Sequence, residues 1–113
     1  MSLEAQTRVR RYSDGTELPD LDDKFIRDDY DEIQLLNVDV TTTKTKIELN
    51  IGTIQFLLVK RTGTAANITI YTTLSANGIT VDEYFLAYDL QGVTVLYLES
   101  SAATTVKLII AGT

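Results

Sequence analysis

The sequence contains no cysteine, no histidine and no tryptophan, and it has one proline among 113 residues. Without cysteine the chain can form neither disulfides nor thiolate metal sites, and without histidine it lacks the usual general base and proton shuttle. Most hydrolase mechanisms depend on one of these groups. We therefore expect a protein that is not an enzyme and binds no cofactor, and the sequence offers no catalytic, cofactor-binding or metal-binding residue.

Long hydrophobic runs are also missing. No apolar stretch approaches the roughly 18 to 20 residues that a membrane-spanning helix requires. The first residues, MSLEAQTRVRR, lack the apolar core of a secretory signal. With 44% hydrophobic and 23% charged residues, the chain has the composition of one soluble domain. We expect no membrane partner and, from these features alone, a cytoplasmic location.

The net negative charge of the protein lies in the first third of the chain. Residues 1–40 contain eleven acids and five bases, a balance of −6, which equals the net charge of the whole protein. Residues 41–113 contain five of each and are neutral. Arg8, Arg10 and Arg11 form a basic cluster, but a run of acids follows them. Affinity for nucleic acid comes from clustered Lys and Arg, so we expect no nucleic-acid partner.

From residue 33 onward, short runs of Val, Ile, Leu, Thr, Tyr and Phe alternate with turn residues, without helical periodicity. This composition is typical of β-strands. Strands that recur about every ten residues without intervening helices favour an all-β, antiparallel β-sandwich or jelly roll. The sequence predicts about eight strands, at 33–40, 46–50, 53–61, 67–74, 79–82, 84–88, 93–99 and 104–111.

Turn residues suggest how these strands connect. Residues 62–66, TGTAA, form a glycine-containing loop, which predicts that the strands at 53–61 and 67–74 pair as a hairpin. Residues 75–78 contain Asn-Gly, the strongest turn signal of the chain. Residues 100–103 are predicted to join the last two strands as another hairpin.

The alternation of apolar residues predicts where two strands lie. The strand at 53–61 is apolar on both faces, which predicts a central position. Its two sets are Ile54, Phe56 and Leu58, and Leu57 and Val59. The strand at 104–111 is more one-sided, with Val106, Leu108 and Ile110 on one face and Lys107 and Ile109 on the other, so we expect it in an outer or interface position.

Residues 1–32 differ in kind from the rest. They have few large apolar residues, the single proline at Pro19 and a dense run of acids, so they cannot supply a core of their own. We expect an extended acidic arm over 1–32 that is ordered by the sandwich domain of 33–113 or by a neighbouring subunit. One or two helical turns are expected near Asp20 or Asp22.

The acids at 20–23 and 28–32 form the one cluster of side chains that could bind a metal ion or take part in chemistry. Closely spaced carboxylates can bind calcium, which takes six to eight oxygen ligands. Their spacing does not match the loop of an EF-hand, which needs alternating acids, a central glycine and a closing glutamate. We favour an acidic segment that faces solvent or an interface.

The six tyrosines and three phenylalanines raise the possibility of carbohydrate binding, because sugars stack on exposed aromatic rings. The absence of tryptophan argues against it. Aromatic residues within strands more often serve core or cross-strand packing. Several of them lie within predicted strands, among them Tyr71, Tyr84, Phe85, Tyr88 and Tyr97. A carbohydrate- or cell-surface-binding module remains the alternative function.

Three segments follow one another from the third predicted strand to the C-terminus: FLLVKRTGTAANITIY, NGITVDEYFLAYDLQGVTVLYLES and SAATTVKLII. Their order resembles that of small β-sandwich structural proteins from tailed-bacteriophage virions, over roughly half of the chain. The resemblance implies a jelly-roll-like subunit that decorates a capsid or forms part of a neck, tail or fibre. It also implies that there are no catalytic residues, and that the protein is located in the virion. Strands that are apolar on both faces leave excess apolar surface in so short a chain, so we expect a homo-oligomer, a trimer being favoured, that contacts other virion proteins.

Overall fold

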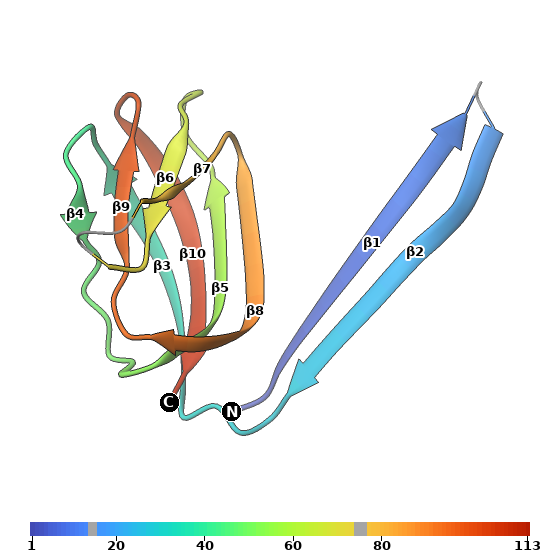
Figure 1. Ribbon diagram of the computed structural model, residues 1–113, viewed down its shortest axis with the longest axis horizontal. Helices are drawn as coiled ribbons and strands as arrows, with labels where there is room; N and C mark the ends of the chain where they lie inside the picture. The colour runs from blue at the N-terminus through green and yellow to red at the C-terminus, as the bar shows by residue number, and fades with distance from the viewer. Residues whose placement is uncertain (14–15, 74–76) are drawn as a thin grey trace. The chain divides into compact units, whose positions relative to one another are not determined.

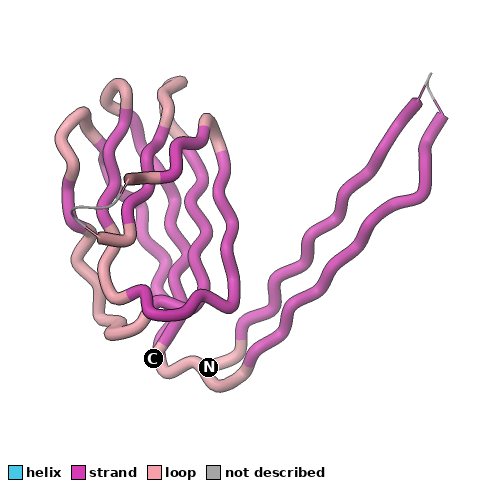
Figure 2. The backbone as a smooth tube through the Cα atoms, in the orientation of Figure 1, coloured by secondary structure: helices cyan, strands magenta, loops and turns pink. Residues whose placement is uncertain are grey.

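The computed structural model describes residues 1–13, 16–73 and 77–113, and within them the protein is all-β, as predicted (Figures 1 and 2). The chain forms two compact units, Met1–Tyr30 and Asp31–Thr113. The described residues contain these strands: β1 (Leu3–Ser13), β2 (Thr16–Arg27), β3 (Glu32–Val40), β4 (Thr45–Lys46), β5 (Ile54–Arg61), β6 (Ile68–Tyr71), β7 (Ile79–Val81), β8 (Tyr84–Val93), β9 (Tyr97–Ser100) and β10 (Thr104–Gly112).

The first unit is a β-hairpin in which β1 and β2 pair antiparallel, from Leu3 opposite Arg27 to Ser13 opposite Thr16. The N-terminal ammonium donates a hydrogen bond to the Tyr30 carbonyl at 2.5 Å and so closes the open end. The predicted helical turns are wrong, because β2 runs through that segment as a strand. A helix of one or two turns is unstable in water, whereas a long ladder pairs backbone groups along its whole length.

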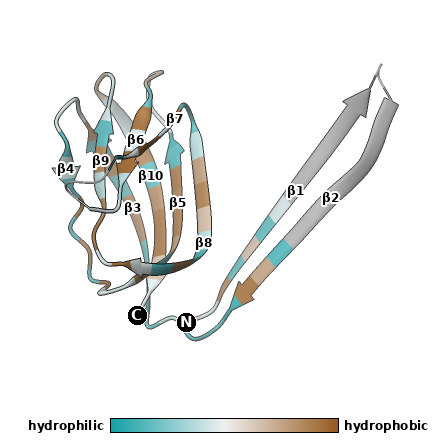
Figure 3. Ribbon diagram, viewed as in Figure 1, coloured by the Kyte–Doolittle hydropathy of each residue, from teal (hydrophilic) through white to brown (hydrophobic). Residues whose placement is uncertain are grey.

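The second unit contains two four-stranded antiparallel sheets that enclose one core. Sheet one has the strand order β3-β10-β5-β8, and sheet two has the order β4-β9-β6-β7. Long stretches of β5 and β10 are hydrophobic (Figure 3). The two inward faces and their connections supply the buried core cluster: Val40, Ile51, Ile54, Leu57, Val59, Ile68, Ile70, Leu96, Leu98, Val106, Leu108 and Ile110.

Both predicted hairpins are wrong, because β5 and β6 lie in different sheets, and so do β9 and β10. Residues 62–67 and 101–103 therefore cross from one sheet to the other. Six residues reach up to about 20 Å, which comfortably spans the roughly 10 Å between packed sheets. Gly63 is there for close approach rather than for a hairpin turn, since a Cβ would lie 2.7 Å from the Thr105 backbone nitrogen.

The expected turn at 75–78 lies partly outside the described residues. The strands on either side of it, β6 and β7, do pair antiparallel, with Ile68 opposite Val81 and Ile70 opposite Ile79.

The predicted central position of the third sandwich strand is correct, because β5 lies between β10 and β8. Of the two positions expected for the last strand, the outer one is wrong, because β10 lies between β3 and β5, and the interface position stays a prediction. An exposed Lys107 indicates that one side of the sheet faces solvent. It does not indicate whether the strand lies at the edge or at the centre of the sheet. One predicted face also changes. The register shifts between Ile54 and Phe56, which brings Ile54 into the core cluster.

Several strand ends differ from the prediction. The strand expected at 46–50 is limited to β4, although Ile47 and Leu49 still pack against the core. The strand expected at 84–88 continues as β8 to Val93, and β9 begins only at Tyr97. Beyond Tyr88 the pairing with β5 is irregular, and Gly92 adopts a positive φ of 72°.

Candidate functional site

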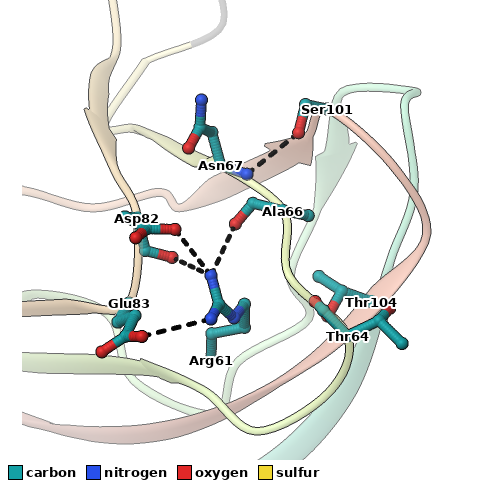
Figure 4. A network of polar contacts seen from close by, with 8 residues as sticks. All are labelled: Arg61, Thr64, Ala66, Asn67, Asp82, Glu83, Ser101 and Thr104. Atoms are coloured by element: carbon teal, nitrogen blue, oxygen red, sulfur yellow. Dashed lines mark hydrogen bonds and ion pairs between the residues drawn. The ribbon is translucent and has the colours of Figure 1, made fainter.

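Arg61, at the end of β5, connects two loops at one end of the sandwich (Figure 4). Its Nη1 donates hydrogen bonds to the Ala66 carbonyl at 3.3 Å, the Asp82 carbonyl at 2.9 Å and Asp82 Oδ1 at 2.7 Å. Its Nη2 lies 3.3 Å from Glu83 Oε1. The Arg61 side chain is 12% exposed, whereas both carboxylates are exposed. The guanidinium thus holds the β5–β6 and β7–β8 connections together.

Threonines form a shallow depression at the same end, with a volume of about 540 Å³. Thr104 Oγ1 donates to the Thr64 carbonyl at 2.7 Å, and Thr64 Oγ1 donates to the Ala103 carbonyl at 3.2 Å. The backbone amides of Thr62 and Gly63 donate to the Thr105 carbonyl. These hydroxyl and amide groups are used in connecting the loops, so the arrangement serves the scaffold rather than a ligand.

An aromatic cluster lies on the outer side of sheet two. Tyr71 of β6 is directly opposite Tyr97 of β9, and Lys44 Nζ lies 3.6 Å from the Tyr71 ring centroid. The Tyr71 hydroxyl donates to Glu99 Oε1 at 2.9 Å, and this bond raises the pKa of Tyr71. The Tyr71 ring therefore already stacks with a cation, and a Cβ on Gly78 would lie 2.8 Å from its Cε1 atom. Cross-strand packing accounts for this tyrosine pair.

The outer side of sheet one carries an unexpected aliphatic row. Ile109 of β10 is opposite both Leu35 of β3 and Leu58 of β5, and Leu58 is opposite Leu86 of β8. None of the four belongs to the core cluster. Leu35 is 67% exposed and the other three are half-buried. These residues form the aliphatic row, which crosses all four strands.

The neighbouring position on the same face is basic. Lys107 of β10 is directly opposite Lys60 of β5, and the two lysines are flanked by Asn37 and Tyr84. Both lysines are exposed, and within the described part of the chain neither forms an ion pair. Like charges directly opposite each other in a sheet repel. We refer to Lys60 and Lys107 as the lysine pair.

The sequence alone does not reveal this surface, because its members are brought together only by register. Leu35 and Ile109 are far apart in the chain, and their adjacency depends on β10 lying beside β3. Two signals in the sequence bear on it: both faces of β5 are apolar, with Leu58 on the face opposite Leu57, and Ile109 shares the face of Lys107.

In the acidic run at 20–32, the side chains of residues 20–23 are not among those that the structure describes. Of its other members, Asp29 forms an ion pair with Arg27, which holds the pKa of the Asp29 carboxyl below its usual range. Among the residues that the structure describes, no group of three or more acids could hold a metal ion, and no helix is suited to crossing a membrane. Comparison of the chain with protein families, curated proteins and solved structures finds no match.

Proposed function

We propose that this protein is a non-enzymatic structural protein of a phage particle, a capsid-decorating subunit or a tail or neck subunit, that acts through contacts with its own copies and with other virion proteins. The observation that carries the proposal is the aliphatic row on the outer side of sheet one. Four aliphatic side chains in register across a whole sheet, with an exposed Leu35 at its edge, suit the apolar centre of a larger protein interface.

The strand order supports the virion role. Counted from β3 as the first sandwich strand, sheet one has the order first, eighth, third, sixth, and sheet two has the order second, seventh, fourth, fifth. Eight strands in this order support a jelly-roll arrangement, an architecture found in viral capsid and lectin domains. The sequence resemblance to small virion subunits points the same way.

The size of the row indicates that it is one part of a larger interface. With strands about 4.8 Å apart and residues of one face about 7 Å apart, the row covers on the order of 100 Å². A stable interface buries roughly 800 Å² on each partner. Further surface must therefore contribute to the assembly.

Light scattering on the full chain tests self-association. We expect a mass of a trimer or larger that falls when Leu35→Asp introduces a charge into the row. Ile79→Asp is the matched control, since Ile79 is 54% exposed but lies in sheet two. A native chain that stays monomeric up to high micromolar concentration would refute the proposal.

Carbohydrate binding is the second candidate, favoured by the half-exposed Tyr97 beside Lys44 and Glu99. Glycan-array screening of the native chain and of Tyr97→Ala tests it. Binding to a glycan class that Tyr97→Ala abolishes, without loss of fold, would move this candidate to first place.

A further inference from the structure

We propose that the outer face of sheet one, made of the aliphatic row and the lysine pair, binds the acidic β1–β2 hairpin of a second copy of this chain. The inference rests on the proposed self-assembly, and it names the two surfaces that meet.

The first argument is the unbalanced charge of the lysine pair. Lys60 and Lys107 face each other across neighbouring strands, and both are exposed. Asp39 is a carboxylate on the same face, but it lies on the edge strand β3 and is opposite Thr105 rather than opposite either lysine. In the sheet by itself this arrangement is unfavourable. An acidic segment laid across it would turn the repulsion into attraction.

The second argument is the charge of the hairpin. Residues 1–30 contain eight acids and five bases, a balance of −3. Four of the acids belong to β2, namely Glu17, Asp20, Asp22 and Asp23. An acidic strand and a basic sheet face are electrostatically complementary, and such complementarity sets partner choice and register.

The third argument is the need of the hairpin for a surface. An isolated two-stranded hairpin is at best marginally stable in water. Near its open end the hairpin carries apolar side chains as well as charges. Ala5 is opposite Phe25, and Ile26 is 59% exposed. The aliphatic row offers such side chains an apolar surface, and the hairpin would add the area that the row lacks.

Length favours a second copy as the partner. β1 and β2 have 11 and 12 residues, whereas β3 and β10 have 9 each. At roughly 3.4 Å per residue, β2 is about 10 Å longer than β3, so one sheet cannot cover the whole hairpin. A hairpin of this length can bridge from one subunit to the next.

Two charge-reversed variants of the full chain test the proposal. The first carries Lys60→Glu and Lys107→Glu, and the second carries Asp20→Lys, Asp22→Lys and Asp23→Lys. Each variant alone should associate about tenfold or more weakly than the native chain, measured by light scattering over a concentration series. Mixing them should restore association between unlike copies, because each hairpin then finds a sheet face of opposite charge on the other variant. The mass should rise at least to that of a pair, since two variants cannot alternate around a closed ring of three.

Lys46→Glu is the matched control, since Lys46 is an exposed strand lysine of sheet two, and it should leave association unchanged. The neutral variant Lys60→Gln with Lys107→Gln covers the case in which charge reversal prevents folding. It should weaken association while raising the thermal stability of the dissociated chain, since it removes a repulsion.

The outcomes separate this inference from the proposed function. If the native chain is monomeric, both fail. If Leu35→Asp dissociates the native oligomer but reversal of the lysine pair does not, self-assembly stands and the hairpin is not the occupant. If both reversed variants dissociate but their mixture does not reassociate, the hairpin does not bind a second copy, and the inference is overturned.

Discussion

Lys60 of β5 lies directly opposite Lys107 of β10, so two like charges share one face of the central strands of sheet one. Lys107→Glu would replace the repulsion with a cross-strand ion pair. We expect the monomeric chain to gain about 0.2 to 1 kcal/mol, visible as a raised melting temperature at low salt and low protein concentration. The gain should vanish at high salt, where charges on the surface are screened. A gain that persists in high salt would point to packing instead.

Gly112 has no room for a side chain. A Cβ at this position would lie 1.8 Å from the Thr53 carbonyl oxygen and 2.9 Å from Ile51 Cγ2. The two backbone hydrogen bonds between Thr53 and Thr113 hold that oxygen in place. Gly112→Ala should therefore destabilise the protein by about 2 kcal/mol or more, measured by urea unfolding.

The control for this experiment is Gly52→Ala. Its Cβ would lie 3.4 Å from the Thr113 carbonyl oxygen, an ordinary contact, so the unfolding midpoint should change little. Equal losses in the two variants would show that the effect comes from the chemistry of alanine rather than from the close approach at Gly112.

Arg61 should contribute to stability mainly through backbone carbonyls. Arg61→Met removes the bonds to the carbonyls of Ala66 and Asp82, and we expect a loss of about 1 to 3 kcal/mol in urea unfolding. Asp82→Asn and Glu83→Gln remove only ion pairs whose carboxylates are exposed, so each should cost less than about 1 kcal/mol. Large losses in the two carboxylate variants would contradict this division.

Much of the fold is predictable from local patterns, and the surface is not. Alternation in Ile54–Arg61 predicts a central strand because both faces of such a strand are covered. Which strands pair is harder to predict from the sequence, since the TGTAA loop suits a hairpin as well as a crossing between sheets. What decides is the approach of Gly63 to Thr105, a contact with a strand forty residues away. The aliphatic row depends on three such pairings at once.

The hydrogen bond from Tyr71 to Glu99 predicts a pH dependence. It raises the pKa of the Tyr71 hydroxyl above 10.0, its ordinary value. Because the pKa of Tyr71 is higher in the folded than in the unfolded chain, the hydrogen bond adds to the free energy of unfolding at neutral pH. This contribution is lost as the pH rises through the folded-state pKa. The native chain should be more stable than Tyr71→Phe at pH 7, with the difference shrinking above about pH 10. Thermal unfolding of both chains across this range measures it, and a constant difference would exclude the titration of Tyr71.

Salt should divide the assembly into an electrostatic and an apolar part. Contacts between the lysine pair and hairpin carboxylates weaken as the screening length falls from about 10 Å at 0.1 M to about 3 Å at 1 M. Burial of the aliphatic row does not weaken with added salt. We expect the dissociation constant of the native oligomer to rise with salt and then level off. Lys60→Gln with Lys107→Gln should start near that level and change little, because its electrostatic part is already gone. Sedimentation or light scattering at several salt concentrations gives both curves, and a double variant that remains as salt-sensitive as the native chain would place the charged contacts elsewhere on the molecule.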